Sequence, residues 1–314
     1  YQTKTRSDRL FQQTDHKIDR INQNIYKLGQ SWIAGETSIS KLSYQEKKSM
    51  FGGRVPNFQG FEYYVGGVFV MPGALGDGSD AKGASSTILS QQESQYPGEF
   101  SWKDRHGEDW ATPVKNQGGC GSCYAFGATA TTELLVNIYF NRHLDYDLSE
   151  QNIVSCAGGS CNGGGTLIGS ADYLKKNGIV LEDCFPYSAS DLNCTEICNN
   201  PSERIKIANW NMCIGEEDIK REIIKGATAA SIPLWEYHIM QILGYKVIEV
   251  GDSLFAGGFG ATSYIPIKQD NPLIGETAWL CKNSWGESWG NNGFAYLIGD
   301  EQGINVLSFS GPVS

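Results

Sequence analysis

The sequence has few histidines and no long apolar run. Only four histidines occur in 314 residues, and no stretch approaches the about 20 apolar residues that a membrane-spanning helix needs. Basic residues are fewer than acidic ones, 25 against 35, and the net charge of −10 argues against nucleic-acid binding. We therefore expect neither a nucleic acid partner nor a membrane span.

A leader segment is also missing from the sequence. The chain starts at Tyr1 without the charged and then apolar stretch of a signal peptide, so we expect that any such peptide has been removed. Hydrophobic residues make up 40% of the chain and charged residues 19%, which is typical of a globular protein. A chain of this length can build more than one sizeable core.

The nine cysteines leave two arrangements open. Either one reactive thiol accompanies four disulfide bonds, or it accompanies three bonds and two further unbridged cysteines. Their density indicates an oxidising compartment, so we expect a secreted, lysosomal or similar location. A zinc site is disfavoured because no histidine pair follows the Cys-x-x-Cys of Cys120 and Cys123. We expect no metal and no cofactor.

Cys123 lies near the start of a predicted helix. The residues from Ala125 to about Tyr139 are good helix formers with recurring apolar positions, which places Cys123 near the first turn. The N-terminus of a helix carries partial positive charge and favours the thiolate, which is the nucleophilic form of cysteine. Cys123 is therefore the candidate nucleophile.

The residues around Cys123 resemble those of papain-like cysteine proteases. Cys120-Gly-Ser-Cys-Tyr124 fits the Cys-Gly-(Ser/Ala)-Cys-(Trp/Tyr) signature of papain and the cathepsins. Some features, including the tyrosine after the nucleophile, are similar to cathepsin C. The other stretches that carry the resemblance are Leu148–Cys156, Gly159–Gly165, Gly178–Tyr187, His238–Tyr245 and Lys282–Gly290.

The resemblance implies a cysteine peptidase that hydrolyses peptide bonds in peptide or protein substrates. Cys123 and His238 would form a thiolate–imidazolium pair, and Asn283 would orient the imidazole ring. The side chain of Gln117 and the main-chain N–H of Cys123 would stabilise the oxyanion. Trp285 would shield the His238–Asn283 hydrogen bond from water.

The resemblance also implies substrate contacts and disulfide pairings. Gly163 and Gly164 would bind an extended substrate through their backbone, and a tight turn at these glycines is an alternative that is compatible with such binding. Tyr237 would narrow a substrate pocket or replace lost packing, and Cys281 is expected to be a buried strand residue. The implied disulfide bonds are Cys120–Cys161, Cys156–Cys194 and Cys184–Cys198.

The implied fold is α+β, with an active-site cleft between two domains. Residues 97–204 would form the helical nucleophile domain, and residues 205–314 a β-rich histidine domain with an antiparallel, barrel-like sheet. Residues 1–96 resemble an inhibitory prosegment with its linker, so we expect a proenzyme inhibited by its own N-terminal segment. In that segment Ser43–Glu46 predicts a capping box for a short helix that Gly52-Gly53 ends.

The histidine domain should be built from short apolar or alternating runs bounded by glycines. The long glycine-rich stretch Gly251–Thr262 is expected to be a loop that caps the cleft. The predicted strands are Ala227–Leu234, His238–Val250, Thr277–Asn283, Phe294–Ile298 and Asn305–Phe309.

Two departures from the family pattern leave a second interpretation open. An aromatic and glycine-containing segment that papain-like enzymes carry before the catalytic histidine is absent there, and Tyr237 is unusually bulky. A similar segment occurs at Phe61–Phe69, so residues 58–72 either fill that position in the histidine domain or resemble it by chance. The alternative function is a catalytically inactive papain-fold protein with a binding or structural role. For an active enzyme, endopeptidase and dipeptidyl peptidase activity both remain open.

Overall fold

The computed structural model describes residues 20, 23, 42–50, 63–65, 68–70, 96–105, 107–234, 236–258, 261–298 and 305–313. The chain divides into two compact units, one of residues 55–97 and one of the remainder. In the smaller unit, β1 (Tyr63–Val65) and β2 (Val68–Val70) pair in an antiparallel sheet of their own. The integration of residues 58–72 into the histidine domain stays a prediction.

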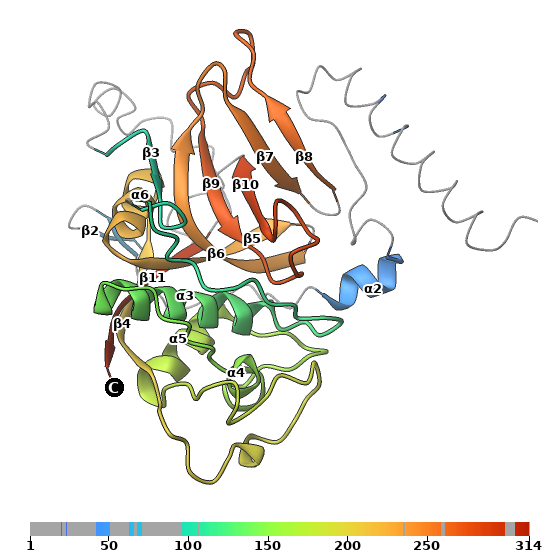
Figure 1. The fold of residues 1–314 in the computed structure, drawn as a ribbon, viewed down its shortest axis with the longest axis vertical. Helices are drawn as coiled ribbons and strands as arrows, with labels where there is room; N and C mark the ends of the chain where they lie inside the picture. Colours follow the sequence, from blue (N-terminus) through green and yellow to red (C-terminus); the bar gives the residue numbers. More distant parts are fainter. Residues whose placement is uncertain are drawn as a thin grey trace, which may run out of the picture. The chain divides into compact units, whose positions relative to one another are not determined.

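The helical part of the larger unit is built around one central helix. That helix, α3, is accompanied by two shorter helices and a 3₁₀ turn. Figure 1 shows α3 between the sheet and the shorter helices, and it is buried over most of its length. The elements are α3 (Cys123–Phe140), α4 (Glu150–Cys156), α5 (Leu167–Lys176) and η2 (Cys194–Glu196).

The other part of this unit is a nine-stranded sheet, ordered β4-β11-β5-β6-β9-β10-β7-β8, with β3 paired to β6. Neighbouring strands are antiparallel except β10 and β7. The strands are β3 (Glu99–Ser101), β4 (Lys206–Cys213), β5 (Ala227–Leu234), β6 (Glu236–Val247), β7 (Ser253–Gly258), β8 (Ala261–Pro266), β9 (Thr277–Lys282), β10 (Phe294–Ile298) and β11 (Asn305–Val313).

All five predicted strands are present, and each begins within two residues of its predicted start. The prediction of a loop over Gly251–Thr262 is wrong, because β7 and β8 form an antiparallel hairpin there. Its glycines suggest a flexible loop, but pairing of β7 with the distant β10 fixes this stretch in the sheet. Helix α6 (Glu216–Lys225) was not predicted, although the sequence offers an acidic first turn and two isoleucines at i, i+4 spacing, Ile219 and Ile223, which the structure buries.

The two parts pack closely because a glycine stands at their contact. Gly127 lies on α3, and a Cβ at this position would be 2.6 Å from Cγ2 of Ile239 on β6. Only glycine lets the helix backbone approach the strand this closely. The contact matters for the site, since Gly127 follows Cys123 by about one helical turn and Ile239 follows His238 directly.

Three disulfide bonds tie the helical part together: Cys120–Cys161, Cys156–Cys194 and Cys184–Cys198. These are the pairings that the resemblance implied. Cys123, Cys213 and Cys281 stand outside these bonds and are buried, so the second of the two cysteine arrangements is the one present. Each bond stabilises the fold, in the loop-entropy view by restricting the unfolded chain.

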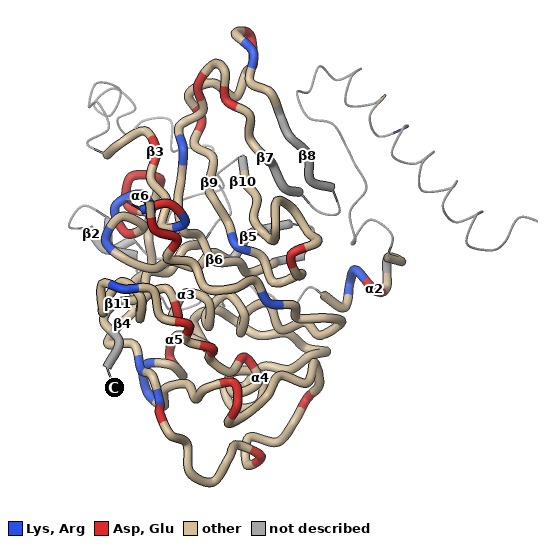
Figure 2. The backbone as a smooth tube through the Cα atoms, viewed as in Figure 1, with Lys and Arg blue, Asp and Glu red and all other residues tan. Residues whose placement is uncertain are grey.

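Figure 2 shows charged residues of both signs along the larger unit, with acidic segments in its helical part as well as on α6. Among the described residues, no helix combines the length and the apolar character needed to span a membrane.

Candidate active site

Cys123 is the first residue of α3, and its side chain is fully buried. The preceding Ser122 is the N-cap residue, but its hydroxyl makes no capping bond to the helix. The sequence predicted Cys123 near the first turn of this helix, and the structure confirms that placement. At this position the sulfur lies near the positive end of the helix dipole, which favours the thiolate.

His238 and Asn283 form a buried hydrogen-bonded pair. His238 Nε2 lies 2.8 Å from Asn283 Oδ1, and the same oxygen accepts a 2.7 Å bond from the main-chain N–H of Ser284. An amide oxygen can only accept, so His238 Nε2 carries the proton. The Trp285 ring covers the pair at 4.6 Å from the His238 ring, with the planes inclined by 32°. The arrangement fixes the tautomer and the orientation of the imidazole.

Burial controls the charge of His238 in this structure. It lowers the pKa of His238 to about 4, while the hydrogen bond to Asn283 acts in the opposite direction. The ring is therefore neutral at pH 7 in this closed arrangement, because an imidazolium there would lose its hydration. The thiolate–imidazolium pair expected from the sequence requires a less buried ring.

Gln117 is fully buried, and both the nitrogen and the oxygen of its side-chain amide form hydrogen bonds. Its Oε1 accepts a 2.6 Å bond from Ser284 Oγ, and its main-chain N–H donates to Ser284 O at 2.8 Å. Its Nε2 donates to Cys120 O and to Met50 O, each at 2.8 Å. The predicted oxyanion donor thus already binds a carbonyl oxygen, and that oxygen belongs to the N-terminal segment.

Met50 follows α2 (Tyr44–Ser49), the short helix expected in this segment. The predicted capping box is present, with Ser43 N donating to Glu46 Oε2 and Glu46 N donating to Ser43 Oγ. The helix ends at Ser49, before the glycines predicted to end it. The Met50 side chain packs in an apolar cluster with Trp285, Trp289 and Ala295, and Leu42 lies at its edge.

A pocket of about 370 Å³ lies between α2 and the residues before Cys123. Its walls include Leu42, Met50, Gly118, Gly119 and Trp285. The pocket shows that α2 and Met50 lie against the same surface as the Gln117 loop and the tryptophan that covers His238.

Of the predicted substrate-binding residues, the structure describes Gly163 and Gly164 fully but only the backbone of Tyr237. The Ser160 N–H donates to Gly164 O at 3.1 Å, and the Gly163 N–H donates to Ser160 Oγ at 2.8 Å. With φ of +64° at Gly164, this is the tight turn considered from the sequence. The backbone of Tyr237 pairs with Pro233, but its side chain is outside the described residues. Substrate binding by these residues stays a prediction.

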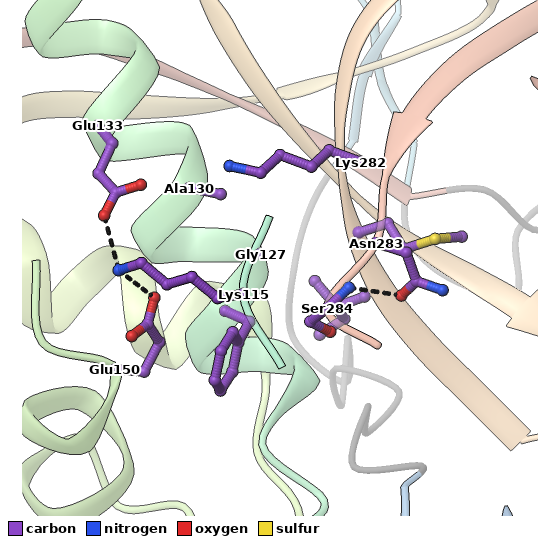
Figure 3. A pocket seen from close by; sticks show the side chains of 11 residues that line it. Lys115, Gly127, Ala130, Glu133, Glu150, Lys282, Asn283 and Ser284 are labelled. Atoms are coloured by element: carbon purple, nitrogen blue, oxygen red, sulfur yellow. Dashed lines mark hydrogen bonds and ion pairs between the residues drawn. The ribbon is translucent and has the colours of Figure 1, made fainter. Parts of the chain in front are cut away.

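A buried charge cluster includes Glu133 of α3 and lies close to Lys282 of β9. Lys115 Nζ bonds Glu133 and Glu150 at 2.9 and 3.0 Å, as Figure 3 shows. Lys282 reaches toward α3 and donates to Thr112 Oγ1 at 2.9 Å. Burial lowers the pKa of Lys282 to about 8, and Glu133 partly opposes this. The cluster borders a cavity of about 20 Å³ that Asn283 and Ser284 also line, so the cluster lies next to the residues that bond His238 and Gln117.

Sequence reasoning gave no role to Ser284 or Tyr187, and both contact site residues. Ser284 joins Gln117 to Asn283, as described above. Tyr187 Oη lies 2.8 Å from Gln117 O and 2.6 Å from Ser122 Oγ. Both belong to stretches that carry the family resemblance, but their side-chain contacts have no local signature. Within the described part of the chain, no group of three or more His, Cys, Asp or Glu residues could hold a metal ion.

A cysteine at a helix start, a His–Asn pair and a buried glutamine amide define a cysteine-protease type of site on an α+β fold. The chain belongs to the papain family: residues 96–309 match the model described as "Papain family cysteine protease".

Among curated relatives, the chain is 29% identical over 249 residues to "Thiol protease aleurain" of Arabidopsis thaliana, covering 73% of this chain and 63% of the relative. It is 32% identical over 202 residues to "Peptidase 1" of Dermatophagoides farinae, covering 62% and 59%. The chain spans about three fifths of the length of these relatives.

Solved structures confirm the predicted α+β papain-like fold. A digestive procathepsin L2 proteinase from Tenebrio molitor larval midgut aligns with a TM-score of 0.66 at 22% identity, covering 99% of this chain and 96% of that one. The proform of Amb a 11, a ragweed pollen cysteine protease, aligns with a TM-score of 0.66 at 20% identity, covering 98% and 90%. Both likenesses concern the fold.

Proposed function

We propose that this protein is a cysteine peptidase that hydrolyses peptide bonds with Cys123, His238, Asn283 and Gln117, and that it exists here as a proenzyme. One observation carries the proposal. The Gln117 amide donates to a peptide carbonyl oxygen, beside a His238 that is already oriented by Asn283. A donor of this kind would equally stabilise the oxyanion of a peptide under attack.

In the proposed reaction, the Cys123 thiolate attacks the substrate carbonyl carbon, and the C=O electron pair moves to the oxygen. Gln117 Nε2 and the Cys123 N–H donate to that oxyanion. The His238 imidazolium gives its proton to the leaving nitrogen as the C–N bond breaks, which leaves a thioester and a free amine. Water then attacks the thioester, His238 accepts its proton, and the C–S bond breaks to release the acid and restore the thiolate.

The proenzyme part of the proposal rests on Met50. Its carbonyl oxygen accepts a hydrogen bond from the Gln117 side-chain amide, and its side chain packs against Trp285. A substrate carbonyl cannot bind Gln117 Nε2 while Met50 does. Two of the structurally similar proteins are likewise described as a procathepsin and a proform. The N-terminal segment would thus be the protein's own inhibitor, and the three disulfide bonds support a secreted or lysosomal location.

The test is covalent labelling of the full chain with a thiol-directed peptide epoxide, before and after incubation at acid pH. We expect mass addition at Cys123 only after acid treatment, and none in Cys123→Ala. Peptides with blocked and free N-termini, assayed on the same samples, distinguish endopeptidase from dipeptidyl peptidase activity. No labelling and no turnover under any condition would contradict the proposal. That result would favour an inactive papain-fold binding protein, the alternative suggested by the missing segment before His238.

A further inference from the structure

The hydroxyl of Tyr187 touches both ends of the loop that carries the site. It donates a 2.8 Å hydrogen bond to the carbonyl oxygen of Gln117 and lies 2.6 Å from Ser122 Oγ. Gln117 is the proposed oxyanion donor, and Ser122 directly precedes Cys123. The loop runs from Gln117 to Ser122. Tyr187, which is distant in sequence, therefore forms hydrogen bonds with the first and the last residue of this loop.

The directions of these two hydrogen bonds are fixed. A phenol has one proton, and the Tyr187 proton goes to Gln117 O, which can only accept. Ser122 must therefore donate its hydroxyl proton to Tyr187. A serine at an N-cap usually accepts a bond from a helix N–H, but Ser122 makes no such bond here. Its hydroxyl is directed toward Tyr187 instead of the start of α3.

Tyr187 is itself held firmly. The Phe126 ring meets its ring edge-on at a centroid distance of 4.8 Å, and its main-chain N–H donates to Glu182 Oε1 at 2.6 Å. The Cys184–Cys198 bond anchors the segment three residues earlier. Such a support lets the hydroxyl act as a fixed point for the loop.

The hydroxyl also keeps its proton over the working pH range. Burial raises the pKa of Tyr187 to about 12, and the nearby Glu150, Cys123 and Glu182 add to this effect. The bond from Ser122 opposes it. The Ser122–Tyr187–Gln117 chain of hydrogen bonds is therefore intact from acid to neutral pH.

We propose that Tyr187 is a positioning residue, whose hydroxyl keeps the Cys123 sulfur and the Gln117 amide in their productive places. The inference rests on the proposed peptidase function, because it concerns the same site. A misplacement of about 1 Å at a reacting group can reduce turnover on the order of 100-fold. Loss of one anchoring hydroxyl should act through kcat, since the Tyr187 hydroxyl bonds Gln117 and Ser122, the two ends of the loop.

The test compares Tyr187→Phe with Tyr146→Phe on the acid-treated full chain. Tyr146 lines the same surface pocket as Tyr187, but its hydroxyl donates to Glu203 and not to the loop. We expect Tyr187→Phe to lower kcat by about tenfold with KM nearly unchanged. The pH at which alkylation of Cys123 by iodoacetamide is half-maximal should also move upward. Tyr146→Phe should leave both unchanged.

A double variant tests whether the hydroxyls of Ser122 and Tyr187 act through the same hydrogen bond. Ser122→Ala removes the other partner of the same bond, so Ser122→Ala/Tyr187→Phe should be no worse than Tyr187→Phe alone. His238 faces Cys123 in the proposed pair and also titrates, so alkylation is repeated in a His238→Gln background. The upward shift should persist there. Additive losses, or a stable Tyr187→Phe with unchanged kcat and alkylation profile, would overturn the inference.

Alkylation does not depend on peptidase activity, so the two proposals can fail separately. A wild-type chain that is alkylated at Cys123 but cleaves no peptide contradicts the proposed function. If its alkylation profile still shifts in Tyr187→Phe, the positioning of the sulfur by Tyr187 holds. If the profile does not shift, the positioning is wrong regardless of activity.

Discussion

The side-chain amide of Gln117 donates a 2.8 Å hydrogen bond to the main-chain carbonyl oxygen of Met50, 67 residues earlier in the chain. Two consequences follow from this one contact. The amide is oriented to bind a peptide carbonyl, as an oxyanion donor must be. The same amide is also occupied by Met50 O, so a substrate carbonyl cannot bind it. We call this arrangement the closed form. Opening requires the loss of this bond and of the Met50 packing against Trp285 and Trp289.

The Met50 side chain should stabilise the closed form. A buried methionine changed to alanine typically costs about 2–5 kcal/mol, and Met50 is almost fully buried. We expect Met50→Ala to accelerate iodoacetamide labelling of Cys123 in the uncleaved chain at neutral pH by about 30-fold or more, the factor that corresponds to the lower of these two energies. Ser49→Ala is the matched control, since the exposed Ser49 hydroxyl bonds only within α2. Equal labelling rates in both variants would show that Met50 does not hold the segment in place.

The closed form should lose stability in acid because of His238. Its pKa is about 4 here against an ordinary 6.5, so the open form binds more protons between these values. The stability of the closed form therefore falls as pH drops from about 6.5 and levels off below about 4, by at most about 3 kcal/mol. Tryptophan fluorescence of Cys123→Ala, which cannot cleave itself, would follow the opening.

The control for this pH dependence is a second histidine. His143 is exposed and follows the C-terminal end of α3, whereas Cys123 begins that helix; its ring nitrogens contact Asp109 O and Asp145 Oδ1. Adding His238→Gln should move the opening midpoint to lower pH, whereas adding His143→Gln should leave it in place. An unmoved midpoint in the His238 variant would assign the acid sensitivity to other groups.

Gln117→Ala should have two opposite effects. In the uncleaved chain it removes the bond to Met50, so Cys123 should be labelled faster. After acid treatment it should lower kcat by about 10²–10³-fold with a smaller change in KM, because the oxyanion forms only during the reaction. Steady-state kinetics and labelling on the same preparation check both. Loss of activity through KM alone would mean that Gln117 only binds substrate.

The ring of Tyr124, the residue after the nucleophile, requires a glycine at position 165. A Cβ on Gly165 would lie 2.6 Å from Tyr124 Cε2. We expect Gly165→Ala to lower the free energy of unfolding by about 1–3 kcal/mol, as overpacking does. Urea denaturation measures this, with Gly98→Ala as the control because nothing lies within 4 Å of a Cβ there. Similar losses in both variants would contradict the steric explanation.

Features with a contiguous pattern could be predicted well. The capping box of α2, the strands β5 and β10, and the helix after Cys123 depend on residues close together in sequence, so local propensity specifies them. The hairpin β7–β8 could not be predicted in this way. Its glycine-rich sequence favours a loop, and only pairing with β10 makes it part of the sheet. Burial of His238, which lowers its pKa, likewise depends on what packs around it.

By itself, the sequence identified the groups that we propose for the chemistry: Cys123, His238, Asn283 and Gln117, each within a recognisable motif. Only the tertiary structure decided what these groups touch. The partner of the Gln117 amide is the carbonyl oxygen of Met50, and the hydroxyl that anchors the loop comes from Tyr187, 70 residues away. A main-chain carbonyl has no sequence signature because every residue has one. Which carbonyl meets the amide is set by packing alone.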